Sequence, residues 1–273
     1  MGDGFRVWGI RRRPAVSLLL KASPLFTLIQ ADLTDPSGLR SLPPVDHVVL
    51  SQAPRGPDES YEKTYGEGTR CLLAAFGKKP RQIVFVSSTG VYGTRDGSWV
   101  DEATDPAGGF ERGIIPPRSQ ALLHAENLVL LSGIPSVILR LGGIYGPGRN
   151  RLRDIKEGRF TGTLTRSYTN RIHRDDAVSA IRLVMEKGKP GEIYLVVDDE
   201  PVTREVFYRW VYEKLDLAVP PRHPGGEGET DLGKRCSNAK IKALGLRLKY
   251  PSFREGYAAL AESSSDSGAA REK

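Results

Sequence analysis

Arginine side chains are concentrated in two short stretches of the sequence, where they could bind phosphate or carboxylate groups. A guanidinium group suits this chemistry because its planar fork donates paired hydrogen bonds to such anions. Residues 1–13 hold four Arg and one Asp, a local charge of +3, and residues 149–174 hold eight Lys or Arg and two Asp or Glu, a local charge of +6. The whole chain carries +7, so the excess lies in these two stretches. This distribution predicts a small anionic molecule as the partner.

Composition excludes several other classes of protein. The chain has 273 residues, 27% of them charged and 39% hydrophobic, which is typical of a globular domain with an ample core. No apolar run reaches the roughly 18 residues that a membrane span needs. Basic residues do not alternate with aromatic ones as a nucleic-acid stacking groove requires. We therefore expect a monomer or homodimer that binds neither a membrane nor nucleic acid.

The two cysteines indicate the compartment. Cys71 and Cys236 match no metal-ligand or CxxC spacing, so no metal site is predicted. Both are expected to be reduced, packed thiols, which favours a cytoplasmic location. If a longer chain precedes Met1, an organellar transit peptide, a plastid one included, is the alternative.

Short apolar runs alternate with segments of helical period, a pattern typical of a parallel sheet covered by helices. Six strands are predicted, at residues 5–10, 27–30, 47–51, 82–87, 136–141 and 192–197. Four helices are predicted, at residues 61–76, 119–131, 175–187 and 204–215. Residues 220–233, rich in Gly and Pro, are expected to form a surface loop.

Four motifs occur in a fixed order along the chain. They are IVFVSSTGVYG at 83–93, VDE at 100–102, ILRLGGIYGPGR at 138–149 and NRIHRDD at 170–176. With SNAKIKALG at 237–245 and YPSFREG at 250–256, the chain resembles the atypical extended short-chain dehydrogenases of the NAD(P)-dependent epimerase/dehydratase family. The resemblance implies a Rossmann-type doubly wound parallel sheet, an α/β fold, with a small C-terminal substrate subdomain.

The same resemblance divides the chain into three parts. Residues 1–150 would form the NAD(P)-binding core, and residues 151–260 a substrate-side subdomain interleaved with it. Residues 261–273, rich in Ser, Ala and Gly, are expected to form a flexible tail.

The resemblance also implies a set of cofactor contacts, and these side chains are Arg11, Arg12, Arg13, Asp32, Leu33, Ser51, Gln52 and Ser87. Three arginines at the end of the second family strand favour the 2′-phosphate of NADP over NAD, although a solvated basic loop is the alternative. Asp32 and Leu33 would contact the adenine, although Asp32 is equally suited to a turn. Ser51 and Gln52 would run beside the ribose and nicotinamide.

On the substrate side, Ser88 aligns with the family's catalytic Ser or Thr, which hydrogen-bonds the reacting oxygen of the substrate. Thr89, Tyr92, Arg149 and Arg171 are the expected substrate contacts. The last two suit an anionic group.

The family's usual base is absent. In the full mechanism a Tyr-x-x-x-Lys pair supplies a tyrosine whose lowered pKa lets it act as a general base. None of the ten tyrosines here has Lys four residues on, and the two positions fall on Pro117/Arg118 and Ala121/Leu122. His124 is near enough in sequence to substitute, but a lone helical histidine is more often a packing or surface residue.

Two further features follow from the sequence. Asp175 and Asp176 are expected to cap the helix that begins beside His173. No glycine-rich phosphate loop of the G-x-G-x-x-G kind occurs before Arg11, so the family's first strand, turn and helix, about 20 to 27 residues by typical element lengths, are missing. That strand is central in the family's sheet, so its absence would leave two unpaired edges and a gap.

Three explanations for this gap stay open: an internal start of a longer protein, an isoform that binds without catalysis, or an enzyme that binds its cofactor weakly. The sequence therefore predicts an NAD(P)-dependent epimerase, dehydratase or reductase-like protein that acts on an anionic small molecule. Loss of the phosphate loop and of the Tyr-x-x-x-Lys pair is expected to impair its activity. The alternative is a non-catalytic NADPH- or metabolite-binding regulatory protein.

Overall fold

The computed structural model describes residues 4–13, 23–54, 60–159, 164–221 and 231–269. Its helices are the 14-residue α3 and α5, the 17-residue α8 and several shorter ones. In chain order the elements are β1 (Val7–Arg11), β2 (Phe26–Gln30), β3 (His47–Leu50), η1 (Glu62–Glu67), α2 (Gly68–Ala75), β4 (Gln82–Ser88), η2 (Thr89–Val91), β5 (Asp96–Val100), η3 (Glu111–Gly113), α3 (Pro117–Leu130), β6 (Ser136–Leu141), β7 (Gly143–Tyr145), α4 (Arg151–Lys156), β8 (Tyr168–Thr169), β9 (Arg171–His173), α5 (Arg174–Lys187), β10 (Ile193–Val196), β11 (Val202–Thr203), α6 (Arg204–Lys214), β12 (Gly233–Cys236), α7 (Ala239–Leu244) and α8 (Phe253–Ala269).

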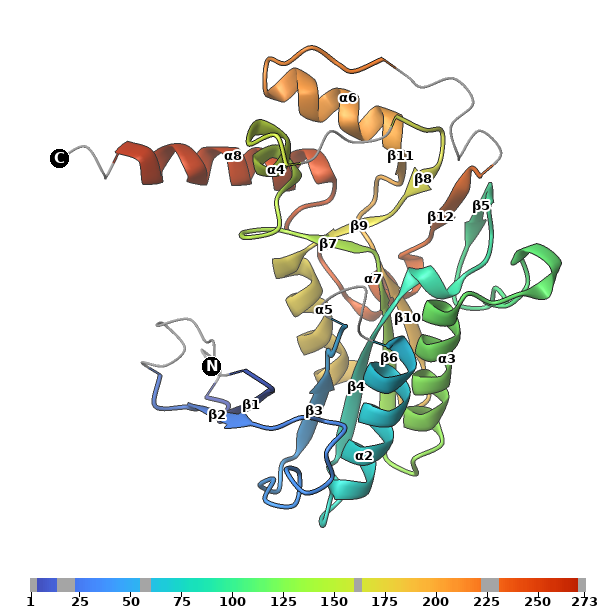
Figure 1. The fold of residues 1–273 in the computed structure, drawn as a ribbon, viewed down its shortest axis with the longest axis vertical. Helices are drawn as coiled ribbons and strands as arrows, with labels where there is room; N and C mark the ends of the chain where they lie inside the picture. Colours follow the sequence, from blue (N-terminus) through green and yellow to red (C-terminus); the bar gives the residue numbers. More distant parts are fainter. Residues whose placement is uncertain (1–3, 14–22, 55–59, 160–163, 222–230, 270–273) are drawn as a thin grey trace.

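The central sheet has the strand order β10-β6-β4-β3, and every pair in it is parallel. Its strands are continuous apolar runs because both faces are covered, and β6 is buried at all six positions. Helices α2 and α3 cover one face and α5 and α7 the other (Figure 1). This confirms the predicted α/β architecture of a parallel sheet between helices.

Strands β1 and β2 form a separate two-stranded parallel sheet. Among the described strands β1 pairs only with β2, and β3 pairs only with β4. Figure 1 shows the β1–β2 pair set apart from β3. The pair still touches the core of the α2–α3 face through Ile10 and Leu33. The two unpaired edges agree with the gap that the sequence predicted between these strands.

A second four-stranded sheet lies beyond the carboxyl ends of the central strands, in the order β11-β8-β12-β5. It takes β5 from the first half of the chain and β12 from near its end. Beside it, α4, α6 and α8 enclose an aromatic cluster that includes Phe207, Phe253 and Tyr257. Segments from both predicted parts of the chain therefore build this side of the molecule.

Two expectations for the C-terminal region need correction. The loop predicted to end at Gly233 gives way there to β12, which follows the edge of β5; residues 222–230 lie outside the described residues. Helix α8 continues to Ala269, through most of the segment predicted as a flexible tail. The helix begins with apolar side chains packed on the aromatic cluster, and this packing outweighs the composition of its later turns.

Candidate active site

Ser88 ends β4 at the carboxyl edge of the central sheet. Its Oγ accepts the main-chain N–H of Gly90 at 3.1 Å and so caps the short helix η2. The hydroxyl proton of Ser88 has no acceptor among the described residues. This side chain can therefore donate a hydrogen bond to a substrate oxygen without breaking its contact with the loop.

Directly behind Ser88, a buried polar network joins β4, α3 and β6. Arg140 forms two hydrogen bonds to the Glu126 carboxylate, at 3.1 and 2.7 Å, and both side chains are less than 5% exposed. Ser87 donates to the same carboxylate at 2.5 Å, and Arg140 donates to the Tyr92 hydroxyl at 2.8 Å. Such a network is stable because every buried charge in it is paired.

This network accounts for two predicted ligand contacts. Ser87 was expected to meet the cofactor, but strand alternation turns its side chain toward Glu126 in the interior. Tyr92 was expected to meet the substrate, but its ring is 2% exposed and its hydroxyl also donates to the Asp101 carbonyl at 2.9 Å. Burial raises the pKa of Tyr92 to about 12, so this phenol stays protonated at neutral pH and is no base.

The loop that follows Ser88 is held from two sides. Ser119 of α3 donates to the carbonyl of Gly90 at 2.8 Å, and Lys234 of β12 donates to the carbonyl of Tyr92 at 2.8 Å. Thr89 is buried, and its side chain is hydrogen-bonded to the thiol of Cys236. The position of Ser88 is thus fixed by contacts from α3 and β12.

The structure brings no replacement base to Ser88 from α3. Pro117 and Arg118, at the first expected position, are exposed in the first turn of the helix, and Ala121 and Leu122, at the second, are buried. His124 instead pairs with Glu62 of η1, Nδ1 to Oε1 at 2.8 Å, at the surface.

On the cofactor side, Arg11, Arg12 and Arg13 are all exposed at the end of β1. Asp32 follows β2 and accepts both the main-chain N–H and the hydroxyl of Thr34, each at 2.9 Å, which is a turn. These hydrogen bonds, followed by the nearby charge of Arg12, lower the pKa of Asp32. Asp32 is therefore an ionised side chain close to the arginine cluster.

The remaining predicted cofactor residues lie in the segments that follow β2 and β3. Leu33 is partly buried against the core of the α2–α3 face, and Ser51 is exposed after β3. Gln52 donates to Thr69 of α2 at 2.8 Å, while its Oε1 is buried without a hydrogen-bond donor among the described residues. Gln52 thus presents an unsatisfied acceptor at the carboxyl end of β3.

The two arginines predicted to bind the substrate lie in different surroundings. Arg149 is exposed in the turn between β7 and α4. Arg171 is enclosed by aromatic rings, with its guanidinium 3.7 Å from the centre of the Phe207 ring and 5.5 Å from that of Phe253. This burial lowers the pKa of Arg171, and the nearby Asp198 opposes the shift. The structure does not bring these two arginines together with Ser88.

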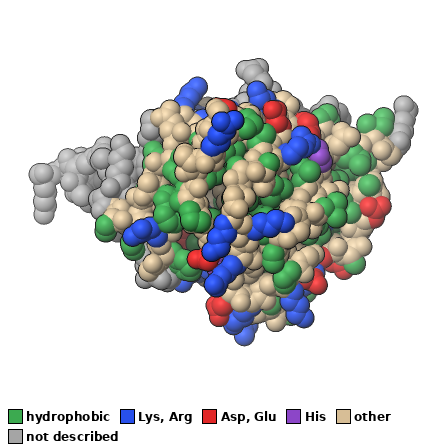
Figure 2. All heavy atoms as spheres, turned by 90° about the horizontal axis from the view of Figure 1, so that it is seen from below, with side chains coloured by type: hydrophobic (Ala, Val, Ile, Leu, Met, Phe, Trp, Pro, Cys, Tyr) green, Lys and Arg blue, Asp and Glu red, His purple; other side chains and the backbone are tan. Residues whose placement is uncertain are grey.

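Several other charges of the basic stretch 149–174 are neutralised by its own acidic residues. Arg151 and Arg159 both pair with Asp154, at 3.1 Å each, and Arg153 pairs with Glu157 at 2.7 Å. Three of the eight basic side chains are thus engaged within the segment, whose local charge of +6 already subtracts the two acidic residues. Figure 2 presents the opposite end of the molecule, where Lys and Arg side chains are interspersed with acidic and hydrophobic ones.

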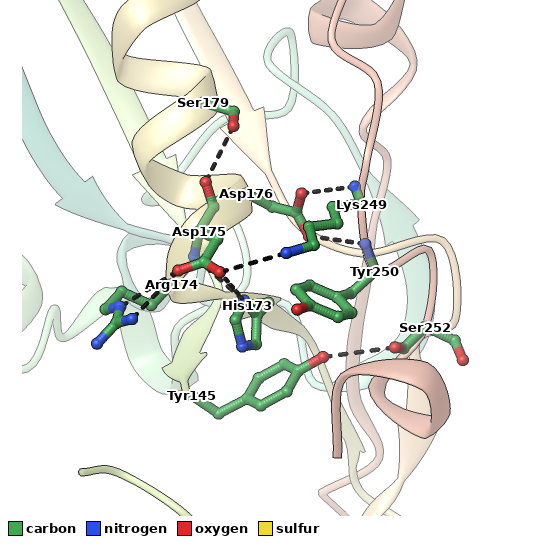
Figure 3. Close-up of polar contacts among 9 residues, drawn as sticks. All are labelled: Tyr145, His173, Arg174, Asp175, Asp176, Ser179, Lys249, Tyr250 and Ser252. Carbon is green, nitrogen blue, oxygen red and sulfur yellow. Dashed lines mark hydrogen bonds and ion pairs between the residues drawn. The ribbon is translucent and has the colours of Figure 1, made fainter. Parts of the chain in front are cut away.

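Hydrogen bonds of the motif around His173 connect β9, α5 and the segment before α8 (Figure 3). His173 is 2% exposed, and its Nδ1 accepts the N–H of Asp175 at 3.1 Å. Asp176 accepts the main-chain N–H groups of Lys249 and Tyr250, at 2.7 and 3.1 Å. The helix cap is thus His173, not the aspartates as predicted, because His173 stands at the N-cap position and Asp175 and Asp176 lie within the first turn.

Within the described part of the chain, no helix combines the length and apolar character needed to cross a membrane. No cluster of three or more His, Cys, Asp or Glu side chains in those same residues is placed to hold a metal ion.

With this geometry, comparison with known proteins defines the class. The model of the NAD-dependent epimerase/dehydratase family matches residues 1–196, more than half of the chain. The chain therefore belongs to this family, as its motifs predicted.

Three relatives give the range of similarity. Protein YeeZ of Escherichia coli strain K12 is 32% identical over 227 residues, which cover 80% of this chain and 76% of YeeZ. A solved structure from Methylobacillus flagellatus, assigned to the NAD-dependent epimerases/dehydratases, is 31% identical with a TM-score of 0.76 and covers 96% of this chain and 91% of that one. A 3-diazoavenalumate denitrifying reductase of a Streptomyces species is 29% identical over 164 residues, 50% of this chain and 51% of the reductase.

Lys234, which is hydrogen-bonded to the loop that follows Ser88, is a residue that the sequence did not single out. Its only signal is its place two residues before the buried Cys236, on a strand too short to be predicted. Arg140 was present in the motif at 138–149, but nothing in the sequence pairs it with Glu126.

Proposed function

We propose that this protein is an NADP-dependent oxidoreductase-type member of its family that acts on a small anionic substrate, with Ser88 as the catalytic hydrogen-bond donor. The observation that carries the proposal is the Ser88 hydroxyl, fixed at the carboxyl edge of the central sheet with its proton available. Ligands of doubly wound sheets bind beyond that edge. The likeness to a reductase supports redox chemistry over other reactions of the family.

The residues present fit one half of the cofactor. Arg11, Arg12 and Arg13 are exposed at the end of β1 and suit the 2′-phosphate of NADP. Asp32 and the unsatisfied Oε1 of Gln52 offer acceptors for the amino and hydroxyl groups of a nucleotide. When bound, the nicotinamide would supply or accept hydride.

The pyrophosphate half is not accommodated by the described residues. In a doubly wound sheet a glycine-rich turn and a helix N-terminus hold this group. No described strand pairs with the outer edges of β1 and β3, where that unit would sit. We therefore infer weak cofactor binding by the chain in this form, and no step is derived through the cofactor.

The test is titration of the full chain with NADPH and with NADH, followed by nucleotide fluorescence. NADPH should bind more tightly, and the double variant Arg11→Ala/Arg12→Ala should lose about 10- to 100-fold in NADPH affinity, the worth of one or two charge-assisted hydrogen bonds. NADH affinity should change little. Arg81→Ala, which removes an exposed surface arginine paired with Asp46, is the matched control. Absence of binding at millimolar NADPH would remove the proposal for this chain.

A second function is favoured by one observation: α3 brings neither a tyrosine nor a lysine to Ser88, and His124 is engaged with Glu62. A protein that binds NADPH or a metabolite without turnover fits this equally. Ser88→Ala separates the two, because turnover lost with NADPH affinity retained supports the enzyme. Wild-type protein that binds NADPH but shows no turnover with any small carbonyl or hydroxyl compound supports the binding protein.

A further inference from the structure

Lys234 is a partly buried cation without a carboxylate partner among the described residues. It lies on β12, and its Nζ donates to the main-chain carbonyl of Tyr92 at 2.8 Å. Asp231, three residues earlier, pairs instead with Arg95 at 2.7 Å. An ammonium group has three donors, so two of those on Lys234 are left for another partner.

The surroundings of Lys234 make a lone positive charge there unfavourable. Burial lowers the pKa of the ammonium, and the charge of Arg95 acts in the same direction. The Cys236 thiol and Asp231 oppose the shift, but burial raises the pKa of Cys236 to about 12, so that thiol is neutral. A charge withdrawn from water and left without a counter-ion is costly. An anion bound at Nζ would remove this cost.

The position of Lys234 places that anion at the loop that follows Ser88. Side chains alternate along β12, so Lys234 and Cys236 share one face. That face meets the loop after Ser88 at two points, Lys234 at Tyr92 and Cys236 at Thr89. Arg235, on the opposite face, stacks between Trp99 and Tyr168, at 5.2 and 5.1 Å from the ring centres. Lys234 is therefore the cation of β12 that faces the reactive loop.

We propose that Lys234 binds the carboxylate or phosphate group of the substrate whose reacting oxygen Ser88 engages. This inference rests on the function proposed above and names the group that makes the substrate anionic. A lysine suits the role because its compact charge can keep the Tyr92 carbonyl and still offer two donors to an anion. Arg149 and Arg171, the arginines expected in this role, do not contact the Ser88 loop in the described structure.

The test measures anion binding without cofactor, by thermal melting of the full chain with increasing malonate and, separately, inorganic phosphate. Lys234→Gln removes the charge but keeps a donor for Tyr92, Lys234→Arg keeps the charge, and Lys187→Gln removes an exposed lysine of α5 as the matched control. The apparent affinity for at least one anion should fall about tenfold or more in Lys234→Gln. It should stay within about twofold in the other two variants.

A direct measurement on the amine completes the test. In protein labelled with ¹³C in its lysine side chains and left unmodified, the Cε NMR signal of Lys234 is identified by its absence from Lys234→Arg. Saturating malonate or phosphate should raise the pH at which this signal titrates and leave the exposed lysines unchanged. The proposal is overturned if Lys234→Gln binds both anions as the wild type does, or if the Lys234 signal responds to neither.

Failure of this proposal is separate from failure of the proposed function. The NADPH titration uses no anionic substrate, and the anion titration uses no cofactor. Anion binding at Lys234 in a chain that does not bind NADPH would leave the site standing and remove the dehydrogenase. The reverse result would leave the dehydrogenase and remove Lys234 from substrate binding.

Discussion

The central sheet and the β1–β2 pair are built from similar kinds of residues but differ in how deeply their strands are buried. Both consist of short apolar runs, yet all six residues of β6 are buried, whereas in β1 four are partly exposed and Arg11 is exposed. The central strands lie between helices on both faces, and β1 pairs only with β2 among the described strands. The comparison teaches that burial is set by the neighbours of a strand and not by its own composition.

The largest effect is expected from the charged interior beside the central sheet. Glu126→Ala leaves the Arg140 guanidinium buried without its counter-ion, which costs about 3–5 kcal/mol of unfolding free energy. Urea denaturation measures the loss. Glu62→Ala, which breaks the surface pair with His124, should cost less than about 1 kcal/mol. Equal losses of unfolding free energy in the two variants would show that the buried pair stabilises the fold no more than the surface pair does.

The same substitution in the two sheets measures their difference directly. Ile138→Ala in β6, at a fully buried position, should cost about 2–5 kcal/mol because it opens a cavity. Ile10→Ala in β1, at a partly exposed position, should cost about 1 kcal/mol or less because less apolar surface leaves water on folding. Denaturant unfolding of both variants gives the values. A larger loss at Ile10 would show that the β1–β2 pair is packed more tightly than its exposure indicates.

A smaller effect is expected from pH, through the buried His173 at the start of α5. Burial lowers the pKa of His173; the charges of Asp175 and Asp176 oppose this shift, and those of Arg174 and Lys249 reinforce it. The folded protein therefore binds a proton at His173 less readily than the unfolded chain, in which the histidine titrates near pH 6.5. Stability should therefore fall as the pH drops below about 6.5. His173→Asn, which keeps a capping oxygen without titrating, should show a shallower decline of melting temperature between pH 7 and 5. An identical decline in both proteins would assign the acid sensitivity to other groups.

Sequence reasoning succeeded where one local signal decides the outcome. The runs around Phe85 and Ile138 predicted buried strands, and the residues 136–141 were predicted without error. It missed β5 and β12 because they are short strands whose pairing joins distant parts of the chain. It also treated Ser87 as a ligand contact, although strand alternation with Phe85 already indicates that Ser87 faces α3.

The candidate site was harder to predict than the fold. The position of Ser88 followed from its motif, but the partners of charged residues depend on tertiary contacts. Arg140 and Arg171 both lie on short strands, and their neighbours in the sequence do not indicate their partners. In the fold Arg140 pairs with Glu126, whereas Arg171 lies against the Phe207 ring. Lys234 could not be recognised as a site residue from the sequence, because only the folded chain brings β12 to the loop that follows Ser88.

The unpaired edge of β3 has a consequence for how copies of this protein meet one another. Val49, in the middle of that strand, is 39% exposed, and the strand offers its outer N–H and C=O groups to any extended segment of suitable length. At high concentration another copy of the chain can supply such a segment. Self-association through this edge would pair these backbone groups and cover Val49, so aggregation at high concentration is the expected consequence.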